Sequence, residues 1–266
     1  MSAKDRYLLS IQRSLGRLSS IIIGPLVLLF IRCMNYRIHD LKKVRETFRA
    51  HIEGHRGPWL ICPNHLTMID SLVIAYAIAP IYRYLIDYRM LPWNLPERAN
   101  FQRNIFLTLL CYLGKCIPVS RGGDREVMRH TLDKCIYLLS KGELVLIFPE
   151  GGRSRTGRVD EENFSYGVGR FVTTVENCQV MCMYLRGEGQ TSYSNFPRFG
   201  ERFALTMDTF YPSSQFNGLK GQRDCAHQIV ERLKQMEEDY FALRGQRHHR
   251  SDNAARERED QRYAFH

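Results

Sequence analysis

Short apolar runs alternate with longer stretches of helical periodicity through the middle of the chain. The apolar runs predict strands at 59–62, 82–86, 115–119, 144–148, 180–184 and 203–207. The stretches between them predict helices at 71–79, 103–113, 125–141 and 166–176, and Gly142 is placed to end the third helix. Strands that alternate with helices are typical of layered α/β domains. We therefore predict an α/β fold with a mixed central sheet flanked by helices.

The two ends of the chain differ from this middle part. Residues 221–243 predict an amphipathic helix whose apolar stripe suits docking onto the domain. From Gly245 the chain is charged and poor in hydrophobic residues, which predicts a disordered tail over 245–266. His248 and His249 suggest metal ligands, but adjacent histidines in a polar tail are usually solvated. We predict no metal site there.

The N-terminal segment contains a run of eleven apolar residues from Ile21 to Ile31, interrupted by Gly24-Pro25 and flanked by arginines on both sides. A spanning helix needs roughly 20 apolar residues, so this run is too short to cross a membrane unaided. No cleavage site typical of a secretory signal follows. The flanking arginines favour a helix that lies in the membrane–water interface, where anionic lipid headgroups hold it. An apolar helix packed on its own domain is the alternative.

Length, charge and cysteine usage narrow the possible functions. A chain of 266 residues accommodates one full-sized domain, so we predict a membrane-associating helical segment at 1–45, a domain at 46–244 and the tail. The net charge of +10 calls for an anionic partner such as nucleic acid, a membrane surface or an acidic substrate. No nucleic-acid-binding signature is present. Eight cysteines without a C-x-x-C pair suit reduced thiols in a cytosolic domain.

The stretch PNHLTMID, residues 63–70, places a histidine and an aspartate five positions apart. On an ideal helix such residues lie about 140° apart and could not meet. They can meet if His65 lies in the turn after a strand and Asp70 lies in the first turn of the next helix, with Thr67 as a candidate cap. A catalytic pair fits this geometry. So does a surface histidine followed by an aspartate that opens a helix.

Two further stretches carry candidate chemistry. In GKCIPVSRGG, residues 114–123, Arg121 follows a predicted strand and can present its planar guanidinium to a phosphate or carboxylate. In LVLIFPEGGRSRTG, residues 144–157, an apolar strand ends at Pro149 and leads into a loop with Glu150, two glycines and two arginines. Glycines allow the backbone to approach a ligand, and exposed N–H groups can meet an anion. The second stretch is the more specific signal.

NHLTMID, GKCIPVSRGG and FPEGGRSR, in this order, resemble the successive motifs of the glycerolipid acyltransferase family. Its best-known members are the 1-acylglycerol-3-phosphate acyltransferases, and the resemblance covers roughly residues 55–190. It favours a catalytic His65–Asp70 pair and implies that Arg121 binds the phosphate of the acceptor. The remaining residues that it assigns to the acceptor site are Asn64, Glu150, Gly151, Gly152 and Arg153.

The resemblance implies transfer of a fatty acyl group from acyl-CoA or acyl carrier protein to the hydroxyl of a lysophospholipid such as 1-acylglycerol-3-phosphate. His65 would act as general base, and Asp70 would fix its tautomer. Backbone N–H groups near Gly151-Gly152 are a candidate oxyanion hole. No cofactor is expected. The implied partners are the acyl donor and membrane lipids, with no nucleic acid, at the cytoplasmic face of a membrane.

The sequence departs from the family pattern in ways that leave the acceptor open. Gly152 stands where threonine or serine is common, and Ser165-Tyr166 fill positions where a lysine is common. Residues 177–189 lack the usual prolines, and 91–104 is a long connection. The acceptor could therefore be a lysophospholipid or a lyso-aminolipid without glycerol phosphate. A catalytically inactive membrane-binding relative is a further alternative, whereas a hydrolase would need a G-x-S-x-G elbow, which is absent.

Overall fold

The computed structural model describes residues 1–102, 104–120 and 122–263. Its centre is a six-stranded sheet in the order β1-β6-β5-β2-β4-β3. The strands are β1 (Arg37–Ile38), β2 (Trp59–Pro63), β3 (Trp93–Asn94), β4 (Val145–Leu146), β5 (Gln179–Gly187) and β6 (Arg202–Phe210). Neighbouring strands are parallel except β5 and β6, which are antiparallel. The predicted mixed sheet is confirmed.

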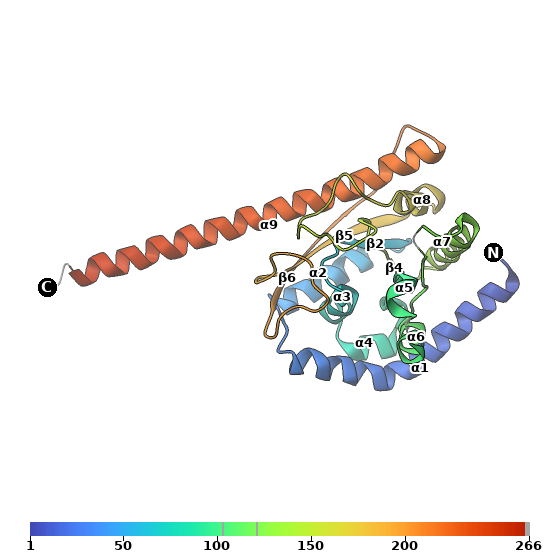
Figure 1. The fold of residues 1–266 in the computed structure, drawn as a ribbon, viewed down its shortest axis with the longest axis horizontal. Helices are drawn as coiled ribbons and strands as arrows, with labels where there is room; N and C mark the ends of the chain where they lie inside the picture. The colour runs from blue at the N-terminus through green and yellow to red at the C-terminus, as the bar shows by residue number, and fades with distance from the viewer. Residues whose placement is uncertain (103, 121, 264–266) are drawn as a thin grey trace.

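Helices cover both faces of this sheet (Figure 1). They are α1 (Ala3–Cys33), α2 (Leu41–Gly54), α3 (Asp70–Ile78), α4 (Ile81–Ile86), α5 (Arg98–Phe101), α6 (Ile105–Leu113), α7 (Arg125–Ser140), α8 (Gly167–Thr174) and α9 (Gly218–Tyr263), with a 3-10 turn η1 (Tyr88–Met90). Side chains of β2 alternate between two cores: Leu60 and Cys62 pack with α7, α8 and α9, whereas Trp59 and Ile61 pack with α2 and α3. The architecture is therefore helix–sheet–helix.

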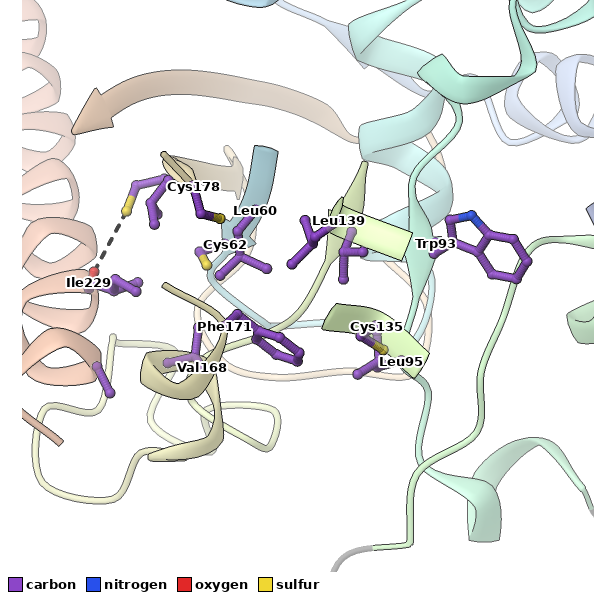
Figure 2. Packing of buried hydrophobic residues seen from close by; sticks show 14 of the residues in the cluster. Leu60, Cys62, Trp93, Leu95, Cys135, Leu139, Val168, Phe171, Cys178 and Ile229 are labelled. Atoms are coloured by element: carbon purple, nitrogen blue, oxygen red, sulfur yellow. Dashed lines mark hydrogen bonds between the residues drawn. The ribbon is translucent and has the colours of Figure 1, made fainter. Parts of the chain in front are cut away.

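Figure 2 shows the first of these cores, where Leu60 and Cys62 of β2 face α8 and α9. Phe171 of α8 and Ile229 of α9 are fully buried in it. Gly169 of α8 lies directly against the backbone of Gln222 in α9, where any Cβ would clash. The two helices therefore meet backbone to backbone, and α9 is fastened to the domain along its first turns.

Two predicted strands are wrong. Residues 81–86 form helix α4, in which Tyr84 is buried while Tyr82 and Ile86 are exposed. This four-residue spacing is helical, although the aromatic and β-branched composition favoured a strand. Residues 115–119 make only isolated bridges, Asn94 to Cys116 and Glu97 to Val119. Lys115 has a positive φ of 56° and Pro118 has no N–H, so a regular ladder cannot form there.

Both predicted segment boundaries fall inside helices of the structure. The boundary at 45/46 falls inside α2, whose Val44 and Phe48 are buried in the same core. At the other end, α9 continues through 245–263, which was predicted to be an irregular tail. The arginine, glutamate, glutamine and alanine content of this segment favours a helix, which explains the difference. The three-segment division stays a prediction.

The N-terminal segment is one continuous helix, α1, that includes Gly24 and Pro25. The apolar run is therefore not interrupted, contrary to the prediction. By length and composition α1 could cross a membrane, and little of its apolar stretch is buried. Helices of this kind also occur as core helices or as signal sequences, so this finding alone does not establish a span.

Candidate active site

The candidate site lies at the carboxyl ends of the parallel strands β2, β3 and β4, where open α/β sheets usually bind ligands. A pocket of about 60 Å³ opens there. Its lining comes from the turn after β2, the start of α3, the end of β3 with the segment that follows it, and the loop after β4. The lining residues are His65, Met68, Ser71, Asn94, Glu97, Asn100, Phe148 and Arg153.

The turn after β2 brings His65 and Asp70 together, with His65 Nδ1 3.0 Å from Asp70 Oδ2. Asp70 is the first residue of α3, so its carboxylate lies at the positive end of the helix. The same carboxylate accepts bonds from the N–H groups of Leu66 (2.7 Å) and Thr67 (2.8 Å) and from the Thr67 hydroxyl. Thr67 was predicted as a candidate helix cap. Its hydroxyl donates to Asp70 instead, so Thr67 does not cap α3.

These contacts determine which ring nitrogen of His65 is basic. An ionised carboxylate only accepts hydrogen bonds, so Nδ1 carries the proton that Asp70 accepts. Nε2 is then the unprotonated nitrogen of the neutral ring. The ring stacks on Phe148, with centroids 3.9 Å apart and planes inclined by 19°. Asp70 and Phe148 together hold His65 in one orientation at the pocket, where it can take a proton from a bound group.

The loop after β4 holds the backbone of His65. Glu150 Oε1 accepts a bond from the His65 N–H (2.9 Å), and the Ser154 N–H donates to the His65 carbonyl (3.0 Å). The second Glu150 oxygen accepts from the Asp160 N–H (3.4 Å). Burial raises the pKa of Glu150 to about 8. Glu150 thus holds the backbone of His65, and its predicted role in the acceptor site stays a prediction.

The two glycines after Glu150 shape the turn of this loop. Gly151 has a φ of 66°, which favours glycine, and its N–H donates to the Phe148 carbonyl (3.0 Å). That N–H is therefore used within the turn and is not available to an oxyanion. Neither Gly151 nor Gly152 is among the residues described around the pocket. Their predicted substrate contacts stay untested.

Arg153 does line the pocket, but its guanidinium is already engaged. Its Nη1 donates to the Ser194 carbonyl (3.0 Å) and to Asn195 Oδ1 (2.8 Å), and the group lies over the Tyr193 ring. The backbone of the same loop also bonds to the turn that holds His65, through Ser194 N–H to Leu66 O and Met68 N–H to Asn195 O. Arg153 thus joins the loop after β5 to the pocket wall.

Two further residues, Asn64 and Arg121, were also predicted to belong to the site. Asn64 is buried, and its amide bonds to both backbone groups of Leu185, as acceptor at 2.7 Å and donor at 3.1 Å. It joins the end of β2 to β5, and its predicted contact with the acceptor stays a prediction. Arg121 lies outside the described residues. The side chains of His248 and His249 are likewise not described, and the described residues contain no group of His, Cys, Asp and Glu suited to a metal.

Sequence reasoning missed the part of the pocket formed by the end of β3 and the segment that follows it. Asn94, Glu97 and Asn100 all lie in the stretch 91–104, which stood out only as a long connection. Asn94 Nδ2 also donates to Ser71 Oγ (3.0 Å), which links this wall to α3. A long, polar insertion between two apolar elements was the available signal. Phe148 was missed because it ends a predicted core strand, where an aromatic residue needs no functional explanation.

The fold and this geometry define an α/β protein with an oriented His–Asp pair at the carboxyl edge of its sheet. The sequence profile described as Acyltransferase matches residues 35–185, more than half of the chain. The chain belongs to this acyltransferase family, as the resemblance of its motifs predicted.

Two relatives are consistent with this membership. A protein of Dictyostelium discoideum named Taffazin is 29% identical over 131 residues, which cover 49% of this chain and 43% of that protein. A protein of Arabidopsis thaliana named N-acylphosphatidylethanolamine synthase is 24% identical over 119 residues, which cover 45% of this chain and 40% of that protein. The chain thus matches less than half the length of each relative.

Proposed function

We propose that this protein transfers a fatty acyl group from a thioester donor, acyl-CoA or acyl carrier protein, to the hydroxyl of a lysophospholipid. The observation that carries the proposal is the His65–Asp70 contact at the pocket, in a chain of the acyltransferase family. His65 Nε2 takes the proton of the acceptor hydroxyl as the oxygen attacks the thioester carbonyl. Asp70 stabilises the imidazolium that results.

The rest of the reaction follows from the same geometry. As the acceptor oxygen forms its bond to the carbonyl carbon, negative charge develops on the carbonyl oxygen, and collapse of the tetrahedral adduct expels the thiolate. The imidazolium of His65 then returns its proton to the thiolate, so the base is restored at each turnover. The acceptor attacks directly, and no serine or cysteine nucleophile of the chain is required.

The acceptor is the finer part of the proposal. A 1-acylglycerol-3-phosphate is the first candidate, with Arg121 as its phosphate ligand, and the cytoplasmic face of a membrane is the proposed location. The pocket wall is polar and carries both charge signs, with Ser71, Asn94, Glu97, Asn100 and Arg153 among its residues. An acceptor with an amine as well as a phosphate fits such a wall, and the name of the Arabidopsis relative includes an aminophospholipid.

The test is an acyl-transfer assay with labelled acyl-CoA or acyl carrier protein and a panel of lysophosphatidate, lysophosphatidylethanolamine and a lyso-aminolipid. We expect His65→Ala to reduce turnover by about 10²–10⁴ on the best acceptor, the usual range for a general base. His227→Ala, at an exposed histidine of α9, is the matched control. Near-normal turnover of His65→Ala, with circular dichroism unchanged, would contradict the proposal.

A further inference from the structure

Exposed apolar side chains gather on three helices that touch one another. α1 packs against both α4 and α6, and the three lie along one side of the molecule (Figure 1). Ile105 and Phe106 of α6 are 88% and 72% exposed, and α6 has no buried residue. We define the apolar face by six exposed residues of these helices: Leu18, Ile22, Leu26, Ile86, Ile105 and Phe106. Large apolar surfaces of this kind mark interaction sites.

The charges of these helices indicate what the apolar face contacts. α1, α4 and α6 together carry the cationic residues Lys4, Arg6, Arg13, Arg17, Arg32 and Arg83, and Asp5 as the one carboxylate. Asp5 is itself paired with His130 and Lys134. A second copy of the chain would bring like charges together across such a face, which opposes self-association. Apolar side chains bordered by cations are complementary to an anionic lipid surface.

The position of α1 on the domain indicates how that surface is approached. Gln12 Nε2 donates to the Tyr112 and Cys116 carbonyls, both at 2.9 Å, and Arg13 Nε lies 2.7 Å from Glu143 Oε1. Gly16 and Gly24 bring the helix against Tyr88 and Ile81, where a Cβ would clash. A helix that crosses a bilayer needs roughly 20 residues away from its domain. With these contacts made, α1 lies flat along the domain.

We propose that the apolar face, including α4 and α6, docks on an anionic lipid leaflet with α1 in the plane of the membrane. The sequence suggested that the N-terminal segment alone binds the membrane. In this proposal it is only one part of the membrane-binding surface. α5, which supplies Asn100 to the pocket, packs against α6. Docking therefore places the pocket wall formed by α5 next to the lipid surface.

The test is vesicle flotation of the full chain with phosphatidylcholine alone or with about one third phosphatidylglycerol. We expect the double variant Ile105→Ser, Phe106→Ser to bind vesicles on the order of tenfold more weakly. The reason is that serine cannot replace the apolar contacts of these two side chains with the lipid acyl chains. The matched control is Leu219→Ser, at an apolar residue of α9 that is 84% exposed. It should bind like the wild type, and wild-type binding should rise with phosphatidylglycerol.

A second measurement reports contact directly. Trp59 and Trp93 are buried, so a tryptophan introduced by Ile105→Trp should be the one quenched by lipids with brominated acyl chains, whereas Leu219→Trp should not be quenched. Wild-type binding by the double serine variant would overturn the proposal. So would a lipid-free dimer that this variant converts to monomer, since the face would then join two copies. Neither measurement uses turnover, so each stands whether or not the acyl-transfer proposal holds.

Discussion

Two buried carboxylates, Asp70 and Glu143, each accept several hydrogen bonds but draw their partners from very different distances along the chain. Asp70 is bonded by His65, Leu66 and Thr67, all within five residues. Glu143 accepts from Lys115 (2.6 Å), Trp93 (2.9 Å) and Arg13 (2.7 Å), which are 28, 50 and 130 residues away. The first carboxylate organises a turn and the second joins three parts of the fold.

The difference lies in what each carboxylate neutralises. Lys115 is completely buried, and burial lowers its pKa to about 8, while Glu143 beside it favours the charged form. The ammonium also donates to the carbonyls of Tyr88 (3.0 Å) and Leu91 (2.7 Å). Removing Glu143 would leave a buried charge without its counter-ion, whereas Asp70 faces a ring that can be neutral. Loss of Glu143 should therefore affect folding, and loss of Asp70 should affect chemistry.

The largest expected effect is on turnover, in Asp70→Asn. The amide oxygen can still accept the N–H groups of Leu66 and Thr67, so we expect the melting temperature to change little. Turnover should fall by about 10²–10⁴, because the neutral amide lacks the negative charge that stabilises the His65 imidazolium formed during the reaction. Asp133→Asn, which removes a half-exposed pair with Arg170, is the control. A loss of stability that accounts for all lost activity would remove the distinction between the two carboxylates.

Glu143→Ala tests the other side of the comparison. We expect the free energy of unfolding to fall by about 3–5 kcal/mol, because Lys115 is left unpaired in the interior. The turnover of the remaining folded protein should stay near that of the wild type. Urea unfolding measures the loss, and adding Lys115→Met should recover part of it by removing the unpaired charge. A loss under about 1 kcal/mol, typical of surface pairs, would show that the cluster does not hold these elements together.

Glu150 sharpens the comparison, because it is a third buried carboxyl group and no ion pair is described for it among residues 1–102, 104–120 and 122–263. Its pKa is raised from 4.5 to about 8, so the folded state holds a proton that the unfolded state releases. The resulting stability is present below about pH 4.5 and is lost as the pH rises through about 8. Relative to Glu150→Gln, the wild type should lose on the order of a few kcal/mol across this window. Urea melts of both proteins at several pH values measure it, and a constant difference would refute the shift.

The parts of the fold and site that follow local rules could be predicted from sequence. The strand–turn–helix at residues 59–78 and the meeting of His65 with Asp70 depend on residues close together in the chain. The strand Trp59–Pro63 is wholly buried and reads directly from its apolar run. For such segments, interactions between residues close together in the chain determine the structure, so the sequence pattern predicts it.

The parts that depend on distant partners could not be predicted. Lys115 was placed at the start of a strand, since its sequence does not reveal that Glu143 and two carbonyls would surround it. Helix α4 was read as a strand because the composition of a six-residue segment is ambiguous until its neighbours determine which side chains are buried. Asn64 was assigned to the acceptor site on resemblance, and its two bonds to Leu185 link residues 121 positions apart.

The bond between Arg13 and Glu143 has a consequence for biosynthesis. A ribosome adds about 5–20 residues per second, beginning at the N-terminus, so the 130 residues between the two partners take several seconds or more to make. During that interval α1 is already synthesised while its acidic partner on the domain is not. The carbonyls of Tyr112 and Cys116, which accept the bonds of Gln12 in the folded protein, have not been made at first either. The order of synthesis therefore leaves α1 without its acidic partner until residue 143 has been made.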